Sequence, residues 1–398
     1  MNQPPRLLAA YTEPRQFEPL IPQRELESLR ARGASIAAQS HALTGRLHPV
    51  TMTQLRELLR AMNSYYSNRI EGQSTHPRDI ARALRREFSS APDVARRQRI
   101  AVAHIAAERE LEALVPAGLE ALSSACARKA HELLYAKLTP EDRMTDDGHV
   151  VEPGEFRADD VAVGRHQPPA HTAIGAFLSR FDKAYGKAGS WESRLFIIGA
   201  AHQRFAWIHP FRDGNGRAAR LMTHAALFPL TGGLWSVARA MARRVDDYYA
   251  GLDAADAPRQ GDLDGRGNLS EKALRAWCSL FLDFCEDQVS FMTKMLDLPD
   301  IKQRIDTLLT VQSQQDRQIR REATLPLHYL FLAGELTRGE FAQMTGLAER
   351  TARSLMARLL ETGLLESSSP KGPVRIGFPL DVLHLLMPRL YPEAASES

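Results

Sequence analysis

One stretch of twelve residues, HPFRDGNGRAAR from His209 to Arg220, combines residue types that suit chemistry on a phosphate chain. Gly214 and Gly216 remove side chains where a helix is expected to begin, so backbone N–H groups can converge on an anion, with the helix dipole behind them. Arg217 and Arg220 share one face of that helix, and their guanidinium groups can reach neighbouring phosphates. The stretch therefore predicts a cradle for a polyphosphate.

Three further side chains add chemistry to this cradle. Asp213 is suited to hold Mg²⁺, which proteins bind through one or two carboxylates together with phosphate oxygens. Asn215 offers amide donors to the same phosphates. His209, with an ordinary pKa of about 6.5, can take a proton from an attacking hydroxyl. Each residue taken singly would more often be structural, but their combination predicts nucleotide transfer to an acceptor. No Gly-Lys-Ser/Thr follows the glycines, so the stretch is not a Walker A loop.

The elements that must position these residues are mainly helices. Apolar residues recur at helical spacing in TMTQLRELLRAMNSYYSNRIEG, which ends at Gly72, and again in ARRQRIAVAHIAAERELEALV. WESRLFIIGAAHQRFAWI and RAARLMTHAALF predict helices directly before and after the twelve residues, which form the loop between them. The stretch DDGHVVEPGEFRADDVAVGRHQPP instead has Gly, Pro and short alternating runs, which predict a hairpin-like loop.

Composition and charge limit the class of protein. The 398 residues are 44% hydrophobic and 25% charged, which is typical of a soluble globular protein of two or three domains. There is no apolar run long enough for a bilayer and no signal-peptide pattern, so we expect a cytoplasmic protein without membrane partners. With 51 basic and 48 acidic residues the surface is mixed, and charge alone does not indicate a nucleic-acid partner. The three cysteines form no Cys-x-x-Cys pair, and we expect structural thiols.

The twelve residues resemble the signature of Fic proteins, which are mainly α-helical enzymes that transfer AMP from ATP to a hydroxyl side chain of a target protein. VAVGRHQPP resembles the target-docking flap of that family, and RGNLSEKALRAWCSLFLDFCEDQ resembles a helix found downstream in its bacterial members. The resemblance covers most of the chain, and no specified position of the signature departs from the family pattern. It implies a Fic helical fold with a short β-hairpin flap, and ATP and Mg²⁺ as cofactors.

Carried over position by position, the resemblance implies a role for most of the signature. His209 would be the general base, Phe211 a core anchor for the loop, and Asp213 the Mg²⁺ ligand. Arg220 would hold the γ phosphate. The α and β phosphates would be held by Gly214, Asn215, Gly216 and Arg217.

A second motif, SNRIEG from Ser67 to Gly72, resembles the inhibitory motif of the same family, Ser/Thr-x-x-x-Glu-Gly/Asn. In the family the glutamate that matches Glu71 pairs with the arginine that matches Arg220. We expect a bidentate ion pair that occupies the guanidinium meant for the γ phosphate, so that ATP binds with misplaced phosphates. The alternative is that Glu71 is a helix-end carboxylate that faces water.

The flap and the adenine site are less sharply marked. The candidate flap runs from Gly154 to His166, and it can hold an extended target segment through main-chain hydrogen bonds. Tyr248 and Tyr249 resemble a tyrosine pair that family members place near the base, and their rings can stack on it. The alternative is that both are core residues. The nucleotide contacts expected from the flap are Val163, Gly164, Arg165 and His166.

The last eighty or so residues resemble a winged helix. In LTRGEFAQMTGLAERTARSLMARLLETGLL, Thr337 and Glu340 form a capping box, Gly346 marks a turn, and Leu355 and Leu359 share one helix face. SSSPKGPVRIGFP then predicts a wing. Arg350, Arg353, Arg358 and Lys371 can meet DNA phosphates. However, residues 321–398 hold 8 Lys and Arg against 9 Asp and Glu, so a protein-docking or dimerisation module remains the alternative to DNA binding.

These observations predict four parts: an N-terminal helical region with the inhibitory motif (1–110), a Fic catalytic domain (111–300), a linker helix (301–320) and a winged helix (321–398). The predicted activity is autoinhibited transfer of AMP from ATP to Tyr, Thr or Ser hydroxyls of target proteins and of the chain itself, with release of diphosphate. Two alternatives stay open. Glu71 can instead orient water to remove AMP from a modified protein, or the site can sense a nucleotide for a DNA-binding regulator, with a homodimer as a further option.

Overall fold

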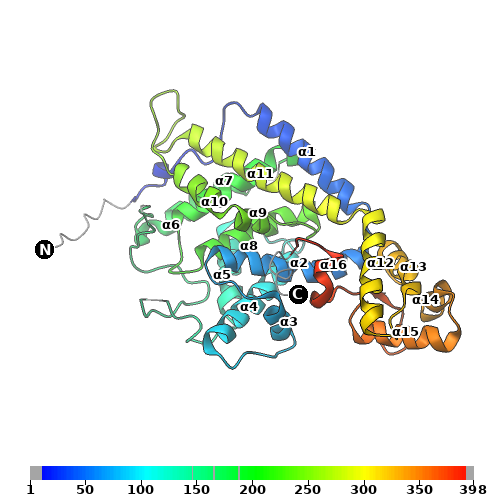
Figure 1. Cartoon of the computed structure of the whole chain (residues 1–398). Helices are drawn as coiled ribbons and strands as arrows, with labels where there is room; N and C mark the ends of the chain where they lie inside the picture. Colours follow the sequence, from blue (N-terminus) through cyan, green and yellow to red (C-terminus); the bar gives the residue numbers. More distant parts are fainter. Residues whose placement is uncertain (1–10, 146, 165, 187–188, 391–398) are drawn as a thin grey trace.

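The computed structural model describes residues 11–145, 147–164, 166–186 and 189–390, and these residues are mainly helical, as the sequence predicts (Figure 1). The helices up to the middle of the chain are α1 (Glu27–Thr44), α2 (Pro49–Ile70), α3 (Pro77–Leu84), α4 (Pro92–Leu114), α5 (Ser124–Tyr135), α6 (Ile174–Tyr185) and α7 (Trp191–Ile208). They are followed by α8 (Asn215–Thr231), α9 (Ala238–Arg243), α10 (Val245–Ala254), α11 (Glu271–Met295) and α12 (Leu298–Gln315).

The predicted helices around the twelve-residue stretch are confirmed. Helix α7 ends at Ile208, and α8 begins at Asn215, so the loop between them is only residues 209–214. Gly216, Arg217 and Arg220 consequently lie in the first two turns of α8. Helix α2 ends directly before Glu71, and α4 continues to Leu114, past the boundary predicted at residue 110.

Helix α7 lies inside the helical body, where it packs against α1, α6, α8 and α11. Most of its side chains are buried, and Gly199 lets α11 approach closely: a Cβ atom there would lie 2.8 Å from the ring of Phe281. The indole of Trp277 on α11 donates a hydrogen bond of 2.6 Å to the Gly199 carbonyl. Because α7 leads directly into His209, this packing fixes where the loop begins.

The long connection between α5 and α6 departs from the predicted β-hairpin. In its described part, isolated antiparallel bridges join Met144 to Val150 and Val163 to His166, the second with backbone bonds of 3.0 and 2.9 Å, and no β-strand is assigned. The rest of the segment from Gly154 is irregular. Side-chain contacts to the loop after α7 hold this segment in place of the backbone hydrogen bonds of a β-hairpin.

The C-terminal elements lie beside the helical body, with α12 leading into them (Figure 1). They are α13 (Thr324–Ala333), α14 (Arg338–Thr345), α15 (Glu349–Glu361), β1 (Leu365–Glu366), β2 (Arg375–Ile376) and α16 (Leu383–Leu386). The capping box of Thr337 and Glu340 is present, Gly346 ends α14 in a left-handed conformation, and β1 pairs antiparallel with β2. The winged-helix assignment and the four-part division of the chain stay predictions.

Two smaller expectations can be compared with the structure. Cys126, Cys278 and Cys285 are free and fully buried, in agreement with structural thiols. Within the described ranges, no helix combines the length and the apolar character that a bilayer crossing requires.

The close packing of α7 on α11 gives a first testable prediction. Gly199→Ala places a methyl group 2.8 Å from Phe281, so we expect the free energy of unfolding to fall by about 1–3 kcal/mol. Gly175→Ala in α6 is the matched control, because a Cβ there meets no atom within 4 Å. It should be neutral or stabilise by up to about 1 kcal/mol. Urea unfolding of both variants measures the difference, and equal midpoints would contradict the packing argument.

Candidate active site

The loop between α7 and α8 is shaped by two left-handed residues. His209 has φ 48° and ψ 59° as it ends α7, and Gly214 has φ 74° as it precedes α8. A left-handed conformation is unfavourable for a residue with a Cβ, at a cost of about 1–2 kcal/mol, so His209 must be held there by its surroundings. At Gly214 a side chain is excluded twice, because a Cβ would also lie 2.7 Å from the ring of Tyr135.

Phe211 anchors the loop in the core, as the sequence analysis predicts. It is fully buried and stacks on the imidazole of His131, with 3.9 Å between the ring centres. The Asn215 side chain closes the loop: its Oδ1 accepts from the Phe211 backbone N–H (2.9 Å), and its Nδ2 donates to the Phe211 carbonyl (2.8 Å). The predicted contact from this amide to a phosphate is therefore not the one the structure favours, since both amide atoms are already used to shape the loop.

Arg157, in the flap segment, is the main support of the His209 conformation. Its side chain is fully buried, and its Nε donates to the His209 carbonyl (3.0 Å), while its backbone N–H donates to the Pro210 carbonyl (2.9 Å). The remaining guanidinium nitrogens donate to the carbonyls of Asp159 and Pro169. One buried cation thus joins both ends of the flap to the loop.

His131 makes a second link between the flap and the loop. Its Nδ1 accepts from the Gly154 backbone N–H (2.9 Å), so the proton lies on Nε2, which donates to the Asp213 carbonyl (3.1 Å). Burial lowers the pKa of His131 to about 4, so the neutral ring that this pattern requires persists at neutral pH. The base of the flap and the acidic residue are consequently fixed relative to each other.

The beginning of α8 has the features of an anion site. Gly214 precedes the helix and carries no side chain to cap it, so the first backbone N–H groups of α8 have no partner within the helix. Such groups, together with the helix dipole, bind phosphate oxygens. The binding of a phosphate at this helix end stays a prediction.

Asp213 is held by a tyrosine that the sequence analysis did not select. The Tyr135 hydroxyl donates to Asp213 Oδ2 (2.7 Å) and accepts from Arg217 Nη2 (2.7 Å), which also lies 3.0 Å from Asp213 Oδ2. Burial would raise the pKa of Asp213, but the positive charge of Arg217 and the Tyr135 hydrogen bond outweigh it and lower the pKa. Asp213 is therefore a carboxylate at neutral pH and half exposed, which suits the predicted Mg²⁺ ligand.

Arg220 contacts the motif from Ser67 to Gly72 that the sequence predicts to be inhibitory. Its Nη2 lies 2.5 Å from Glu71 Oε1 and donates to the Ser67 carbonyl (3.0 Å), and its Nε donates to the Ser67 hydroxyl (2.9 Å). The Arg220 side chain is only 3% exposed, against 29% for Glu71, so the alternative of a glutamate that merely faces water is wrong. The expected bidentate pair is wrong in detail, because Ser67 takes the second position on the guanidinium.

Glu71 also lies against the cradle itself. A Cβ at Gly216 would come within 2.4 Å of Glu71 Oε1 and 3.0 Å of Arg220 Nη1. Gly216 is therefore needed for the close approach of the carboxylate to the first turn of α8. Gly72 follows with φ 70°, which lets the chain turn sharply away after the glutamate.

Residues from motifs that are distant in the sequence line one cavity of about 300 Å³. It is lined by Glu71, His209, Gly216 and Arg220, by Val163 and His166 from the flap, and by the Tyr248 and Tyr249 pair. Asp213 and Arg217 are not among these lining residues and lie at Tyr135 instead. Gly164 occupies the turn between the two flap residues, and Arg165 lies outside the described residues.

The two tyrosines at the cavity differ in solvent exposure. Tyr248 is buried, and its hydroxyl lies 2.9 Å from His202 Nε2 and also interacts with Arg220. Tyr249 is 47% exposed, and its hydroxyl donates to the Ile70 carbonyl (3.1 Å) at the end of α2. Stacking on a base stays a prediction for both rings.

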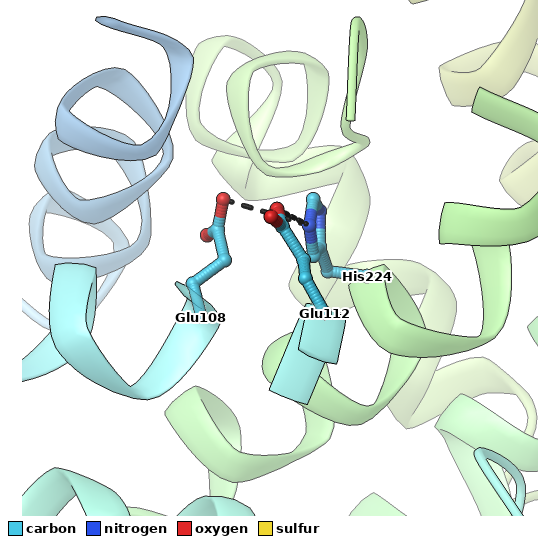
Figure 2. Close-up of side chains that lie close together, drawn as sticks. All are labelled: Glu108, Glu112 and His224. Carbon is cyan, nitrogen blue, oxygen red and sulfur yellow. Dashed lines mark hydrogen bonds and ion pairs between the residues drawn. The ribbon is translucent and has the colours of Figure 1, made fainter. Parts of the chain in front are cut away.

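Below Arg220, a buried polar cluster connects three helices (Figure 2). His224, one turn after Arg220 on α8, lies 2.9 Å from Glu112 and 3.5 Å from Glu108, both on α4. From α2, Arg60 pairs with Glu112 (2.5 Å) and Asn63 donates to Glu108 (2.8 Å). Three such ligand atoms within 4.8 Å of one another can bind a metal ion, but Arg60 already supplies the compensating charge. The cluster therefore holds α2 against α4 and α8.

Titration within this cluster follows from its burial. Burial raises the pKa of the Glu108 carboxyl. Burial has the same effect on Glu112, but hydrogen bonds from His224 and Arg60 outweigh it and lower the pKa of Glu112. Burial lowers the pKa of His224, and the two carboxylates more than reverse that effect.

His209 differs from its expected titration. Burial, with a smaller effect from nearby positive charge such as that of Arg157, lowers its pKa from 6.5 to about 4. The imidazole is consequently neutral and able to accept a proton over the whole physiological range. The ordinary pKa assumed from the sequence ignored this burial.

The lowered pKa of His209 can be measured directly. In an NMR titration of histidine-labelled protein, the His209 resonance, assigned with His209→Asn, should shift near pH 4. Because burial disfavours the charged ring, the neutral form should be the only one above about pH 6. A midpoint near the ordinary value of about 6.5 would contradict the burial described here.

Arg157, His131 and Tyr135 were all missed by the sequence analysis. His131 and Tyr135 are four residues apart on the otherwise apolar face of α5, and polar residues in such a position are a usable signal. Arg157 stands in an irregular segment without periodicity, so no local pattern marks it. Only the meeting of the flap with the loop gives it a role.

Comparisons with known proteins agree with this geometry. The chain matches the Fic/DOC family over residues 121–227. Two curated relatives called protein adenylyltransferase Fic, from Drosophila ananassae and Culex quinquefasciatus, are 39% and 41% identical to it over 83 residues. That segment is 20% of this chain and 17% of each relative, so the chain spans only a small part of those relatives.

A solved structure extends the comparison to the fold. The Fic family protein from Desulfovibrio desulfuricans G20 superposes with a TM-score of 0.51 and 20% identity, and the match covers 92% of this chain and 98% of that chain. At this identity the likeness shows a shared fold. The chain therefore contains a region, residues 121–227, that matches the Fic/DOC family, within a fold shared with a solved Fic family protein.

Proposed function

We propose that the chain is a protein adenylyltransferase that transfers AMP from ATP to a hydroxyl group of a target protein, and that Glu71 holds it inactive. One observation carries the proposal: the guanidinium of Arg220 is bound by Glu71 and Ser67 at the first turn of α8, where a polyphosphate would lie. The names of the curated relatives support the activity.

In the proposed reaction, His209 accepts the proton of the target hydroxyl as its oxygen attacks the α phosphorus. The new bond joins that oxygen to the phosphorus, and the bond from the phosphorus to the oxygen bridging to the β phosphate breaks, which releases diphosphate. The amide groups of the first turn of α8 bind the phosphate oxygens, and Arg217 and Arg220 balance their charge. Asp213 fits a Mg²⁺ ion, which when bound would neutralise further charge on the phosphates.

The flap would supply the acceptor. The described part of residues 154–166 is fixed to the loop through Arg157 and His131, so a target segment bound to it has a set distance from His209. Positioning of this kind accounts for much of the rate of such reactions, and an error of about 1 Å can cost on the order of 100-fold. A rigid flap is therefore part of the proposed machinery.

Inhibition would follow from competition for one cation. With Glu71 on Arg220, the γ phosphate has no arginine to bind, and the carboxylate repels it from the helix N-terminus. ATP that still enters the cavity would be displaced from the line of attack. Removal of the glutamate side chain should restore the correct position.

One comparison of three proteins tests the proposal: wild type, Glu71→Gly, and Glu71→Gly with His209→Ala. Each is incubated with Mg²⁺ and ATP labelled at either the α or the γ phosphate, alone and with a cell extract as a source of targets. We expect Glu71→Gly to incorporate α label at least about 10-fold faster than wild type, because one recovered charge contact is worth roughly 1.4 kcal/mol or more. The double variant should incorporate none.

Other outcomes separate the alternatives. Incorporation of γ label would indicate phosphate transfer instead. If Glu71→Gly is no faster than wild type, autoinhibition is wrong. If wild type removes AMP from labelled protein and Glu71→Gly does not, Glu71 serves hydrolysis. That outcome would favour the alternative in which Glu71 orients water.

The support of His209 by Arg157 gives a separate prediction. In the Glu71→Gly background, Arg157→Lys keeps the charge but cannot bond three carbonyls at once, so we expect kcat to fall about 10- to 100-fold with ATP affinity nearly unchanged. Arg204→Lys is the control, because Arg204 is also fully buried and bonds the carbonyls of Pro19 and Ala255 away from the loop. Equal losses of kcat in the two variants would show a general effect on stability.

A further inference from the structure

We infer that the C-terminal segment, residues 324–390, controls AMP transfer by holding α2 in the position from which Glu71 reaches Arg220. This inference rests on the proposed inhibition by Glu71 and adds the element that sets it. It comes from contacts that the C-terminal segment makes with both ends of α2 and with none of the nucleotide-binding residues described above.

The first contact is at the beginning of α2. The hydroxyl of Thr51, which is fully buried, donates to the carbonyl of Phe331 (3.0 Å) in the last turn of α13. Carbonyls at the end of a helix have no partner within it, so Thr51 satisfies a group that would otherwise be buried without one. Gly334, just after α13, approaches the side chain of His48 so closely that a Cβ there would lie 2.0 Å from its Nδ1. The end of α13 therefore abuts the first turn of α2.

The second contact is near the end of α2 that carries the inhibitory motif. The hydroxyl of Tyr66, fully buried, donates to the Leu390 carbonyl (2.8 Å). Arg239 on α9 donates to the neighbouring Arg389 carbonyl (3.1 Å), which fixes the same stretch of chain. Tyr66 directly precedes Ser67, the residue that shares Arg220 with Glu71. The residue of α2 that bonds Leu390 is therefore the direct neighbour of a residue that makes the inhibitory contact.

Between these ends, Arg60 and Asn63 of α2 bond to Glu112 and Glu108, two residues of the cluster drawn in Figure 2. A helix of 22 residues is about 33 Å long and moves as a unit, so a shift at either outer contact carries to Glu71.

The test uses the full chain and the AMP-transfer assay with α-labelled ATP. Tyr66→Phe removes the hydroxyl that bonds Leu390 and also interacts with Arg239, which fixes the same stretch. We expect basal transfer to rise about two- to ten-fold, to a level below that of Glu71→Gly. Tyr185→Phe is the matched control, since Tyr185 is equally buried and its hydroxyl donates to the Leu20 carbonyl in another part of the core. It should lose similar stability without a gain in transfer.

A second variant guards against a failure of the first to fold. Thr51→Val keeps the side-chain shape and removes the bond to Phe331 at the other end of α2, and it should raise transfer in the same direction. Adding Tyr66→Phe to Glu71→Gly should give no further gain, because the brake is already absent. If both variants stay at the level of Tyr185→Phe while Glu71→Gly is active, control by the C-terminal segment is wrong and autoinhibition stands. If Glu71→Gly is inactive as well, both are wrong.

Discussion

The site depends on the burial of Arg220. A guanidinium that is 3% exposed cannot stay without a partner, because a buried and unpaired charge costs several kcal/mol. The chain supplies that partner from α2, through Glu71 and Ser67. The proposed substrate supplies another, the γ phosphate. Two anions that compete for one buried cation form a switch that needs no large change in the catalytic residues themselves.

The rest of the structure keeps this competition local. Arg157 and His131 fix the flap and the loop to each other through the carbonyls of His209 and Asp213, neither of which contacts Glu71. The cluster of Glu108, Glu112 and His224 fixes the inner side of α2 one turn below Arg220 (Figure 2). In the proposed mechanism, inhibition would consist of the position of one carboxylate.

Much of this arrangement could be predicted from the sequence, because it depends on residues that are close together in the chain. Helical periodicity placed α2, α4, α7 and α8, and the glycines marked the backbone that must approach an anion. Glu71 could be paired with Arg220 only through resemblance, since 149 residues separate them and no periodicity connects them. The structure adds the geometry: Ser67 shares the guanidinium, so the pair is not bidentate.

What the sequence could not predict depends on tertiary surroundings. The pKa of His209 falls because its partly buried imidazole is desolvated, and desolvation is not visible in a loop sequence. Asn215 looks like a phosphate ligand until both of its amide atoms are found on Phe211. The flap looks like a hairpin from its glycines, yet side chains from α5 and Arg157 take the place of a ladder. In each case a long-range contact outweighs the local pattern.

The most direct measurement of the central claim is the affinity of wild type and Glu71→Gly for ATP and for ADP, by calorimetry in the presence of Mg²⁺. ADP lacks the γ phosphate, so it does not compete with Glu71 for Arg220. The account predicts that Glu71→Gly raises the preference for ATP over ADP by about 10-fold, the worth of one charge-assisted contact. An equal change in both affinities, or none, would contradict the competition for Arg220.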